Sequence, residues 1–337
     1  MKRFQLIALL YLVVALYACR KETRIEKIAD PGYYGRTKFV LEDYQATTSF
    51  NTFLKQYAPT LADSLATTTH YTVMAPDNVA FKIMLQYTLF NDTLLLQRFI
   101  RFPYYVLKGD VKLSDLPAGL NHELTALNGN KLWVSKWVKG QDTTIAVNGS
   151  FLSLTDAPTS NGYINILKRT YNGQYSSNLV DVINNEYKLS FFAAALQHTQ
   201  LDNLLRSQNE YTVIAPDNNA FQEAGYTSIS SLLQLDKAEL TNLLKNHILP
   251  GRRFLTDMEM ELGTSADTLR LNALSGNTVR AFMAPSNIYI LPNSLSIYLL
   301  GPNNNYSPWT MPFTNKEYVT TFVAGNGVIH TSKLVIN

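Results

Sequence analysis

Apolar residues follow two different periods along this 337-residue chain, and the same order of periods occurs twice. Alternation with period two, which is typical of half-buried strands, occupies residues 132–138 and 143–147, and a last strand is predicted around 328–336. Apolar side chains three and four residues apart predict amphipathic helices near the start of each half. The residues with this helical spacing are Phe50, Phe53, Leu54, Tyr57, Leu179, Val182, Ile183, Phe191, Phe192, Ala195 and Leu196.

One eleven-residue segment is present twice, at an offset of 140 residues. Residues 71–81 read YTVMAPDNVAF and residues 211–221 read YTVIAPDNNAF, so nine of the eleven positions are identical. The same offset relates two leucine pairs upstream, Leu61 with Leu65 and Leu201 with Leu205. A match at one fixed offset indicates a duplicated domain, and the long period means that each copy has its own core.

The repeated segment predicts a strand, a stop and a helix start. Its first five residues are β-branched or aromatic enough for a short strand, and Pro76 then removes a backbone donor. Asp77 is a good N-cap, and Asn78 supports a turn. Pro216, Asp217 and Asn218 repeat the same steps in the second copy. None of these residues is a nucleophile or a phosphate-binding loop.

The run T-V-x-A-P-D-N-x-A-F resembles the first conserved motif of the fasciclin (FAS1) domain family. Asn326-Gly327-Val328-Ile329-His330 resembles the family's second motif, and 243–251 (LLKNHILPG) is similar to the stretch between them. The resemblance implies an α+β fold of two tandem FAS1-like domains, each a β-sandwich wedge flanked by helices. It also implies a structural role for the motif residues Thr72, Pro76, Asp77, Asn78, Phe81, Thr212, Pro216, Asp217, Asn218, Phe221, His247, Asn326, Gly327 and His330.

The first copy departs from this family pattern at both histidines. Tyr105 stands where the second copy has His247, and Asn165 stands where it has His330. We therefore expect that the histidines are dispensable to the fold, and that no function carried by them is present in the first copy.

Length and local composition place the boundaries. A chain of this length, with 46% hydrophobic and 16% charged residues, fits two globular domains. The predicted segments are a signal peptide (1–18), a tether (19–38), a first domain with its histidines replaced (39–170), a linker (171–177) and a second domain (178–337). The second domain is longer, and its extra residues are placed near 291–313, as a long irregular loop or hairpin.

The N-terminus resembles the signal of a bacterial lipoprotein. Lys2 and Arg3 precede an apolar run of signal-peptide length, which ends in Leu16-Tyr17-Ala18-Cys19. Cys19 is the only cysteine, so the chain has no disulfide framework. We expect lipidation at Cys19, a lipid-anchored protein of the outer membrane and, by resemblance to lipoproteins of Bacteroidetes type, exposure at the cell surface.

Aromatic residues supply the candidate binding sites. Tyr298, Tyr306 and Trp309 fall in or beside the predicted extension, where a loop has little core to fill. Trp133 and Trp137 share one strand face and, with Tyr104 and Tyr105, suit either a sugar-stacking platform or one end of the first domain's core.

No catalytic constellation is predicted. His247 and His330 lack a third ligand for a metal, and we interpret them as structural; Glu259 and Glu261 are interpreted as a solvated strand edge. No phosphate loop or G-x-S-x-G motif is present, and the net charge of +3 comes without a basic, aromatic-rich run. We therefore expect no enzyme activity, no cofactor, no metal and no nucleic-acid partner.

Three functions remain open. By resemblance, the first is a surface-anchored adhesion or recognition protein that binds an extracellular protein or glycan. The second is an accessory glycan-binding lipoprotein of an outer-membrane polysaccharide uptake complex. The third is a periplasm-facing structural protein that docks a partner.

Overall fold

The structure is a computed structural model that describes residues 32–87, 101–171, 175–263, 268–285, 295–300, 306–309 and 321–336. Residues from Gly35 to Asn337 form one compact unit, separate from Met1–Tyr34. Within the larger unit, the residues before about 171 are called the first half and those after it the second half. Cys19 and the predicted signal peptide lie outside the described residues.

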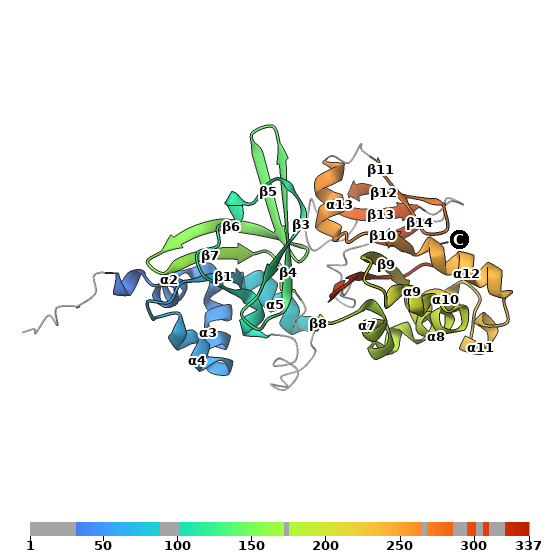
Figure 1. Ribbon diagram of the computed structural model, residues 1–337, viewed down its shortest axis with the longest axis horizontal. Coiled ribbons are helices and arrows are strands. Elements are labelled where there is room, and N and C mark those ends of the chain that lie inside the picture. Colours follow the sequence, from blue (N-terminus) through green and yellow to red (C-terminus); the bar gives the residue numbers. More distant parts are fainter. Residues whose placement is uncertain are drawn as a thin grey trace, which may run out of the picture. The chain divides into compact units, whose positions relative to one another are not determined.

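The first half combines a set of helices with one long bent sheet. The sheet has the strand order β2-β1-β7-β6-β5-β4-β3, and it changes direction at β6, which the pairing irregularities after Leu152 and Leu154 mark (Figure 1). The helices are η1 (Tyr33–Gly35), α2 (Thr37–Asp43), η2 (Gln45–Thr47), α3 (Thr48–Tyr57), α4 (Pro59–Ser64), α5 (Asn78–Tyr87), η3 (Phe102–Tyr105) and η4 (Leu113–Asp115). The strands are β1 (Tyr71–Pro76), β2 (Val106–Lys108), β3 (Gly119–Thr125), β4 (Lys131–Lys139), β5 (Asp142–Val147), β6 (Ser150–Thr159) and β7 (Gly162–Leu167).

The second half divides its strands between two sheets. One has the order β10-β9-β16-β15-β8, and the other has the order β11-β12-β13-β14. The helices are α7 (Leu179–Asn185), η5 (Tyr187–Leu189), α8 (Ser190–Thr199), α9 (Leu201–Leu205), α10 (Asn218–Glu223), α11 (Ile229–Leu232), α12 (Lys237–Asn246) and α13 (Leu255–Leu262). The strands are β8 (Tyr175–Ser176), β9 (Tyr211–Pro216), β10 (Ile248–Pro250), β11 (Thr268–Asn272), β12 (Thr278–Pro285), β13 (Leu295–Leu300), β14 (Tyr306–Trp309), β15 (Thr321–Ala324) and β16 (Gly327–Ser332).

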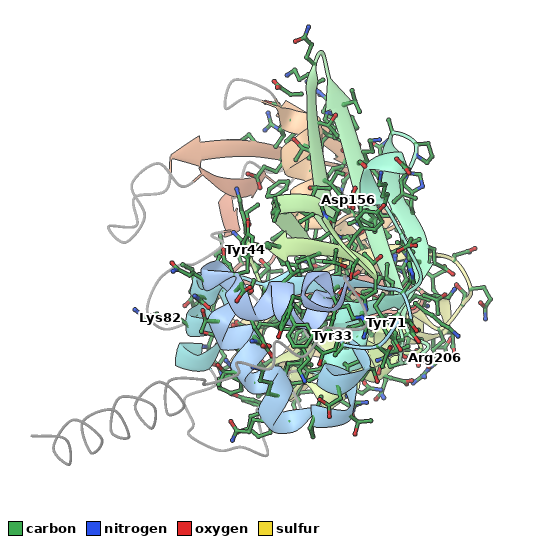
Figure 2. All side chains as sticks on the ribbon, turned by 90° about the vertical axis from the view of Figure 1, so that its left-hand side faces the viewer. Tyr33, Tyr44, Tyr71, Lys82, Asp156 and Arg206 are labelled. Atoms are coloured by element: carbon green, nitrogen blue, oxygen red, sulfur yellow. The ribbon has the colours of Figure 1, made fainter. Side chains whose placement is uncertain are left out.

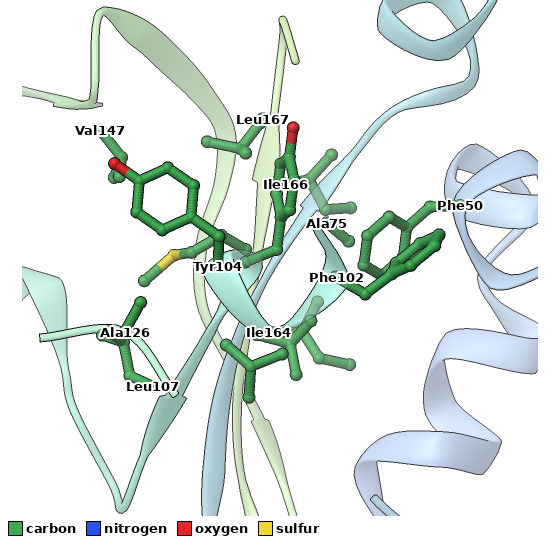
Figure 3. Close-up of a cluster of buried hydrophobic side chains, with 14 of the residues drawn as sticks. Phe50, Ala75, Phe102, Tyr104, Leu107, Ala126, Val147, Ile164, Ile166 and Leu167 are labelled. Atoms are coloured by element: carbon green, nitrogen blue, oxygen red, sulfur yellow. The ribbon is translucent and has the colours of Figure 1, made fainter. Parts of the chain in front are cut away.

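Each half has its own helix-covered core, as the duplication predicts. In the first half, Phe50 of α3 packs against Phe81 of α5 and Phe102 of η3, and the cluster continues onto β1 and β7 (Figure 3). In the second half, Phe192 of α8 and Phe221 of α10 are fully buried in the equivalent cluster. The helical periodicity read from the sequence is confirmed by α3, α7 and α8, and the α+β architecture is confirmed as well.

Several predicted boundaries are corrected by the structure. Helix α2 begins at Thr37, inside the predicted tether, and Thr37 is buried. Tyr171, at the start of the predicted linker, is buried in the first half's core. Strand β8, which also lies within the predicted linker, pairs with β15 and so belongs to the second half. The last strand ends at Ser332, four residues earlier than predicted. At the tether and the linker, contacts over long sequence separations override the local composition.

The structure decides between two alternatives for one segment and corrects the prediction for another. The predicted extension at 291–313 contains β13 and β14, which pair as an antiparallel hairpin, so the hairpin alternative holds and the irregular loop does not. Glu259 and Glu261 lie on α13 and not on a strand, and both are half-buried. Alternating methionine and glutamate fits a short helix as well as a strand, because so few residues do not distinguish the two periods.

Candidate functional site

The polar residues of the first repeated motif hold each half together. Asp77 accepts a hydrogen bond from the amide of Ala80 at 2.7 Å, and Asp217 accepts one from the amide of Ala220 at 2.9 Å. These are N-caps, as the sequence predicts. The next residue bonds to the preceding helical segment: Asn78 accepts from the amide of Ser49, and Asn218 accepts from the amide of Phe191.

The Asn-Gly pair of the second motif forms a clamp that is present in both halves. The Asn161 side chain accepts from the amide of Thr37 and donates to the carbonyls of Leu65 and Thr67. The Asn326 side chain accepts from the amide of Leu179 at 2.9 Å and donates to two more carbonyls, Leu205 and Ser207, at 2.8 Å each. Each clamp therefore fastens the first helix and the α4 or α9 turn to the last strand.

The glycine of the clamp is required by close packing. A Cβ at Gly162 would lie 1.7 Å from the Tyr71 carbonyl oxygen, and a Cβ at Gly327 would lie 2.1 Å from that of Tyr211. Both glycines also have positive φ angles, +142° and +158°. The motif is thus a junction between parallel strands, β1 with β7 and β9 with β16.

His247 and its counterpart Tyr105 bridge the same two parts of each half. His247 is fully buried and contacts the carbonyl of Ile214 through Nδ1 and the amide of Ile336 through Nε2, both at 2.9 Å. Tyr105 donates from its hydroxyl to the carbonyl of Tyr171 at 2.7 Å and stacks on that ring at 4.2 Å between centroids. In both halves the side chain therefore reaches the chain beyond the last strand.

His330 and its counterpart Asn165 also occupy equivalent places with different partners. His330 contacts the carbonyl of Arg253 through Nε2 at 2.9 Å and the hydroxyl of Thr321 through Nδ1 at 3.1 Å. Asn165 accepts from the amide of Asp156, which lies on β6 (Figure 2). The Asp156 carboxylate in turn accepts from the amides of Leu113 and Ser114. Burial lowers the pKa of His247 to about 3 and that of His330 to about 4, so both are neutral at pH 7.

A second buried cluster joins the two halves around Arg252. Its guanidinium lies 3.6 Å from the centroid of the Trp133 ring and donates to the carbonyls of Ala324, Gly325 and Gly327. Glu210 accepts two further hydrogen bonds from it, at 3.0 and 3.1 Å. A buried guanidinium is costly unless every donor is used, and this one is closely surrounded by acceptors.

The cluster extends along α13. Phe254 packs with Trp133, Val323 and Val328, and a Cβ at Gly149 would lie 2.9 Å from its ring. Asp257 is fully buried, and its Oδ2 accepts from the amide of Phe254 and from the side chain of Asn121. Burial raises the pKa of Asp257 to about 6. Sequence reasoning missed Arg252, Asn121 and Asp257 because nothing in their local pattern marks a contact with residues over 100 positions away.

The aromatic candidates have different outcomes. Trp133 is 2% exposed, and Tyr104 and Tyr105 are buried in the first half's core, as Figure 3 shows for Tyr104. The core alternative therefore holds for the two tyrosines, and none of the three rings is open to a sugar. Trp133 covers the junction of the halves instead, and Trp137 is half-buried on β4. Tyr298 lies on β13, and Tyr306 and Trp309 lie at the two ends of β14. Their side chains are outside the described residues, so their binding role stays a prediction.

Within the described residues, no group of three or more His, Cys, Asp or Glu side chains is placed to hold a metal ion. In the same residues, no helix has both the length and the apolar character needed to cross a bilayer.

The chain consists of two similar halves in tandem, each a wedge of sheet covered by helices and fastened by an Asn-Gly clamp. This architecture defines the class of protein. The fasciclin domain model matches residues 45–170 and 187–301, and the chain belongs to the fasciclin domain family. Among curated proteins, it is 25% identical over 219 residues to transforming growth factor-beta-induced protein ig-h3 of Sus scrofa, covering 60% of this chain and 31% of that protein. It is 29% identical over 192 residues to periostin of Homo sapiens, covering 57% of this chain and 21% of that protein.

The matches to these curated relatives span less than a third of their length. Among solved structures, the FAS1 domain pair from the insect cell adhesion molecule fasciclin I matches with a TM-score of 0.40 and 15% identity. That match covers 87% of this chain and 97% of the insect chain.

Proposed function

We propose that the protein is a lipid-anchored adhesion or recognition protein of the cell surface, without catalytic activity. Membership of the fasciclin domain family supports this proposal. One observation carries it: the polar side chains of the conserved motifs form hydrogen bonds that stabilise the fold. The side chains of Asp217, Asn218 and Asn326 each bond to backbone groups of the same half, and the first half repeats the arrangement. Binding is therefore assigned to the outer surface of the two wedges.

The anchor is tested separately from the binding. Lipidation at Cys19 predicts that Cys19→Ala moves the protein from the membrane fraction to soluble or signal-uncleaved material, because the acyl chains supply the membrane affinity. Cys19→Ala protein that partitions into detergent like the wild type would contradict the lipoprotein assignment. Protease treatment of intact cells then distinguishes surface exposure from a periplasmic location.

The binding surface is assigned to the β13–β14 hairpin of the second half. Large aromatic side chains dominate interface energies, so Tyr306→Ala with Trp309→Ala should weaken retention of cells on immobilised extracellular protein by about tenfold or more. A matched control is Thr143→Ala with Thr144→Ala, at exposed positions of β5. A large loss of stability with unchanged retention would show that the two aromatics are packed parts of the fold.

The glycan-binding alternative has lost part of its support. Trp133, one of the two tryptophans that suit a sugar-stacking platform, is buried beneath Arg252. Saccharides that shift the tryptophan fluorescence of the intact protein at millimolar concentration would restore this alternative.

A further inference from the structure

His247 occupies a position where its two ring nitrogens have opposite roles. A backbone carbonyl only accepts a hydrogen bond, so Nδ1, which contacts the Ile214 carbonyl, must carry the proton. A backbone amide only donates, so Nε2, which contacts the Ile336 amide, must present its lone pair. The neighbouring backbone therefore fixes His247 as the neutral Nδ1–H tautomer.

Protonation of His247 is incompatible with this arrangement. The second proton must go to Nε2, where it would face the N–H of Ile336, so that hydrogen bond breaks. The C-terminal segment (residues 333–336) would lose its attachment at the end of α12. Val335 belongs to the helix-covered core, and Ile336 belongs to the cluster that α13 covers, so the segment joins two apolar clusters.

The remaining attachments of the C-terminal segment are weaker or more exposed. The Asn246 side chain donates to the Ile336 carbonyl at 3.4 Å, which is a long bond. Lys333 pairs with Asp217 at 2.7 Å, but the lysine side chain is 42% exposed, and such pairs contribute little. His247 is thus the buried polar contact that holds the Ile336 amide.

No charged side chain compensates a proton on His247 among its described contacts. The ring meets β9 at Ile214, the C-terminal segment at Ile336 and α8 at Phe192, whose ring lies 6.2 Å away between centroids. Ionisable residues on or directly beside these elements are Glu210, Tyr211, Asp217, His198 and Lys333, and α12, which ends at the residue before His247, adds Asp236, Lys237, Glu239 and Lys245. The pKa of His247 responds instead to burial, which lowers it to about 3, and to the Ile214 carbonyl, which raises it.

The other two bridging positions lack this incompatibility. The Nδ1 of His330 contacts a hydroxyl, and a hydroxyl can rotate to accept from a protonated ring. Tyr105 of the first half donates to a carbonyl and does not change charge between pH 4 and pH 7. Only His247, of the three, must give up a hydrogen bond when it gains a proton.

We propose that His247 is a proton-operated latch: acidification releases the Ile336 amide and frees the C-terminal segment of the second half, while the first half stays closed. Such a latch couples local pH to the second half of the protein. It is independent of the proposed function, since it requires only the fold.

Amide hydrogen exchange of the full chain, corrected for the intrinsic effect of pH, tests the latch. In the open form, His247 is exposed and has the ordinary histidine pKa of about 6.5, whereas in the closed form its pKa is lowered. Below pH 6.5 the open form therefore binds one more proton than the closed form. The opening equilibrium of the Ile336 amide should therefore rise by up to about tenfold per pH unit from 6.5 down to about 4. The Asp77 amide of the first half, which bonds to the Leu167 carbonyl, should show no such change.

Three variants separate the latch from other effects of acid. His247→Gln keeps a donor and an acceptor but does not titrate, so the exchange of Ile336 should lose its pH dependence. His330→Asn and Lys333→Gln remove the other buried histidine of the second half and the ion pair, and each should leave the pH dependence of Ile336 in place. Equal protection of wild-type Ile336 at pH 7 and pH 4, or the same acid response in His247→Gln, would overturn the proposal.

Nitrogen-15 NMR of the histidines in the wild-type protein supplies a test that needs no variant. The expected result is the Nδ1–H tautomer of His247 at pH 7, with protonation and loss of Ile336 protection occurring together. An Nε2–H tautomer, or protonation near pH 6.5 without any change at Ile336, would contradict the latch even if His247→Gln does not fold.

Discussion

The two halves keep the same junctions but differ at two bridging positions, one that reaches the chain beyond the last strand and one that lies on the last strand itself. Thr72 and Thr212 make the same contacts, each donating to a glycine carbonyl and accepting from an amide two residues further on. Asn161 and Asn326 clamp the same backbone groups. At the bridges, by contrast, Tyr105 replaces His247, and Asn165 with Asp156 replaces His330.

Both halves make a side-chain connection at each bridge, and only the second half uses imidazole for it. That the histidines of the second half are dispensable to its fold stays a prediction. The replacement also changes the response to pH, because a buried neutral histidine opposes folding once the unfolded chain becomes protonated. Both lowered pKa values, about 3 and about 4, belong to the second half.

The largest expected effect on the free energy of unfolding concerns the clamp glycines, which both halves share. Gly162→Ala and Gly327→Ala each force a Cβ against a backbone carbonyl, at 1.7 and 2.1 Å, and neither neighbour is a flexible side chain. Each substitution should lower the free energy of unfolding of its own half by about 4 kcal/mol or more. Urea unfolding of the full chain, with hydrogen exchange to identify the half affected, measures it.

Gly129 and Gly276 provide matched controls. They have φ angles of +82° and +87°, and an added Cβ would meet nothing within 4 Å. Alanine there should cost only about 1 kcal/mol, for backbone strain alone. If the controls and the clamp glycines cost the same, φ and not close packing explains the Asn-Gly motif, and the clamp argument fails.

The sequence predicts those features of the fold that depend on a few neighbouring residues and that occur in both copies. The N-caps at Asp77 and Asp217 follow from a polar residue placed between a proline and an apolar run, and the duplication places the second copy without further information. The contact of Trp133 with Arg252 has no such signature, because it joins residues from two copies that the repeat treats as equivalent. The aromatic spacing on β4 therefore leaves a platform and a core end as alternatives, and neither includes the cover that Arg252 provides for Trp133.

The next largest effect concerns the junction, where the halves contribute unlike residues. Arg252→Met keeps the apolar stem but leaves the carbonyls of Ala324, Gly325 and Gly327 without this donor. Removing one side of such a buried polar network should cost about 3–5 kcal/mol. Exposed Arg206, which pairs with Asp181 at the surface, gives a control whose replacement by Met should cost under about 1 kcal/mol. Equal urea midpoints for the two variants would show that the buried guanidinium contributes no more than a surface ion pair.

A smaller effect is expected when the second half is made to resemble the first. His330→Asn removes contacts with the Arg253 carbonyl and the Thr321 hydroxyl and should cost about 1–3 kcal/mol at pH 7. Because a histidine with a lowered pKa favours folding less as pH falls below 6.5, this cost should shrink between pH 6.5 and about 4. Unfolding by urea at several pH values measures the trend. A metal bound stoichiometrically by the wild type and lost in the variant would contradict the structural role.

The smallest expected effect is an increase in stability, whereas the substitutions above lower it. It concerns Asp257, the buried acid at the junction. Its folded pKa, about 6, lies above the ordinary value of 3.8, so the stability it contributes is complete below pH 3.8 and is lost as pH rises through 6. Asp257→Asn is neutral at every pH and should avoid that loss. The gain is reduced because an amide oxygen accepts less strongly from Phe254 and Asn121 than a carboxylate does. We therefore expect Asp257→Asn to be about 1 kcal/mol more stable than the wild type at pH 8 and no more stable at pH 4. A variant that is less stable by the same margin at both pH values would mean that the ionised carboxylate is needed to join the halves, and that its burial is not the dominant cost.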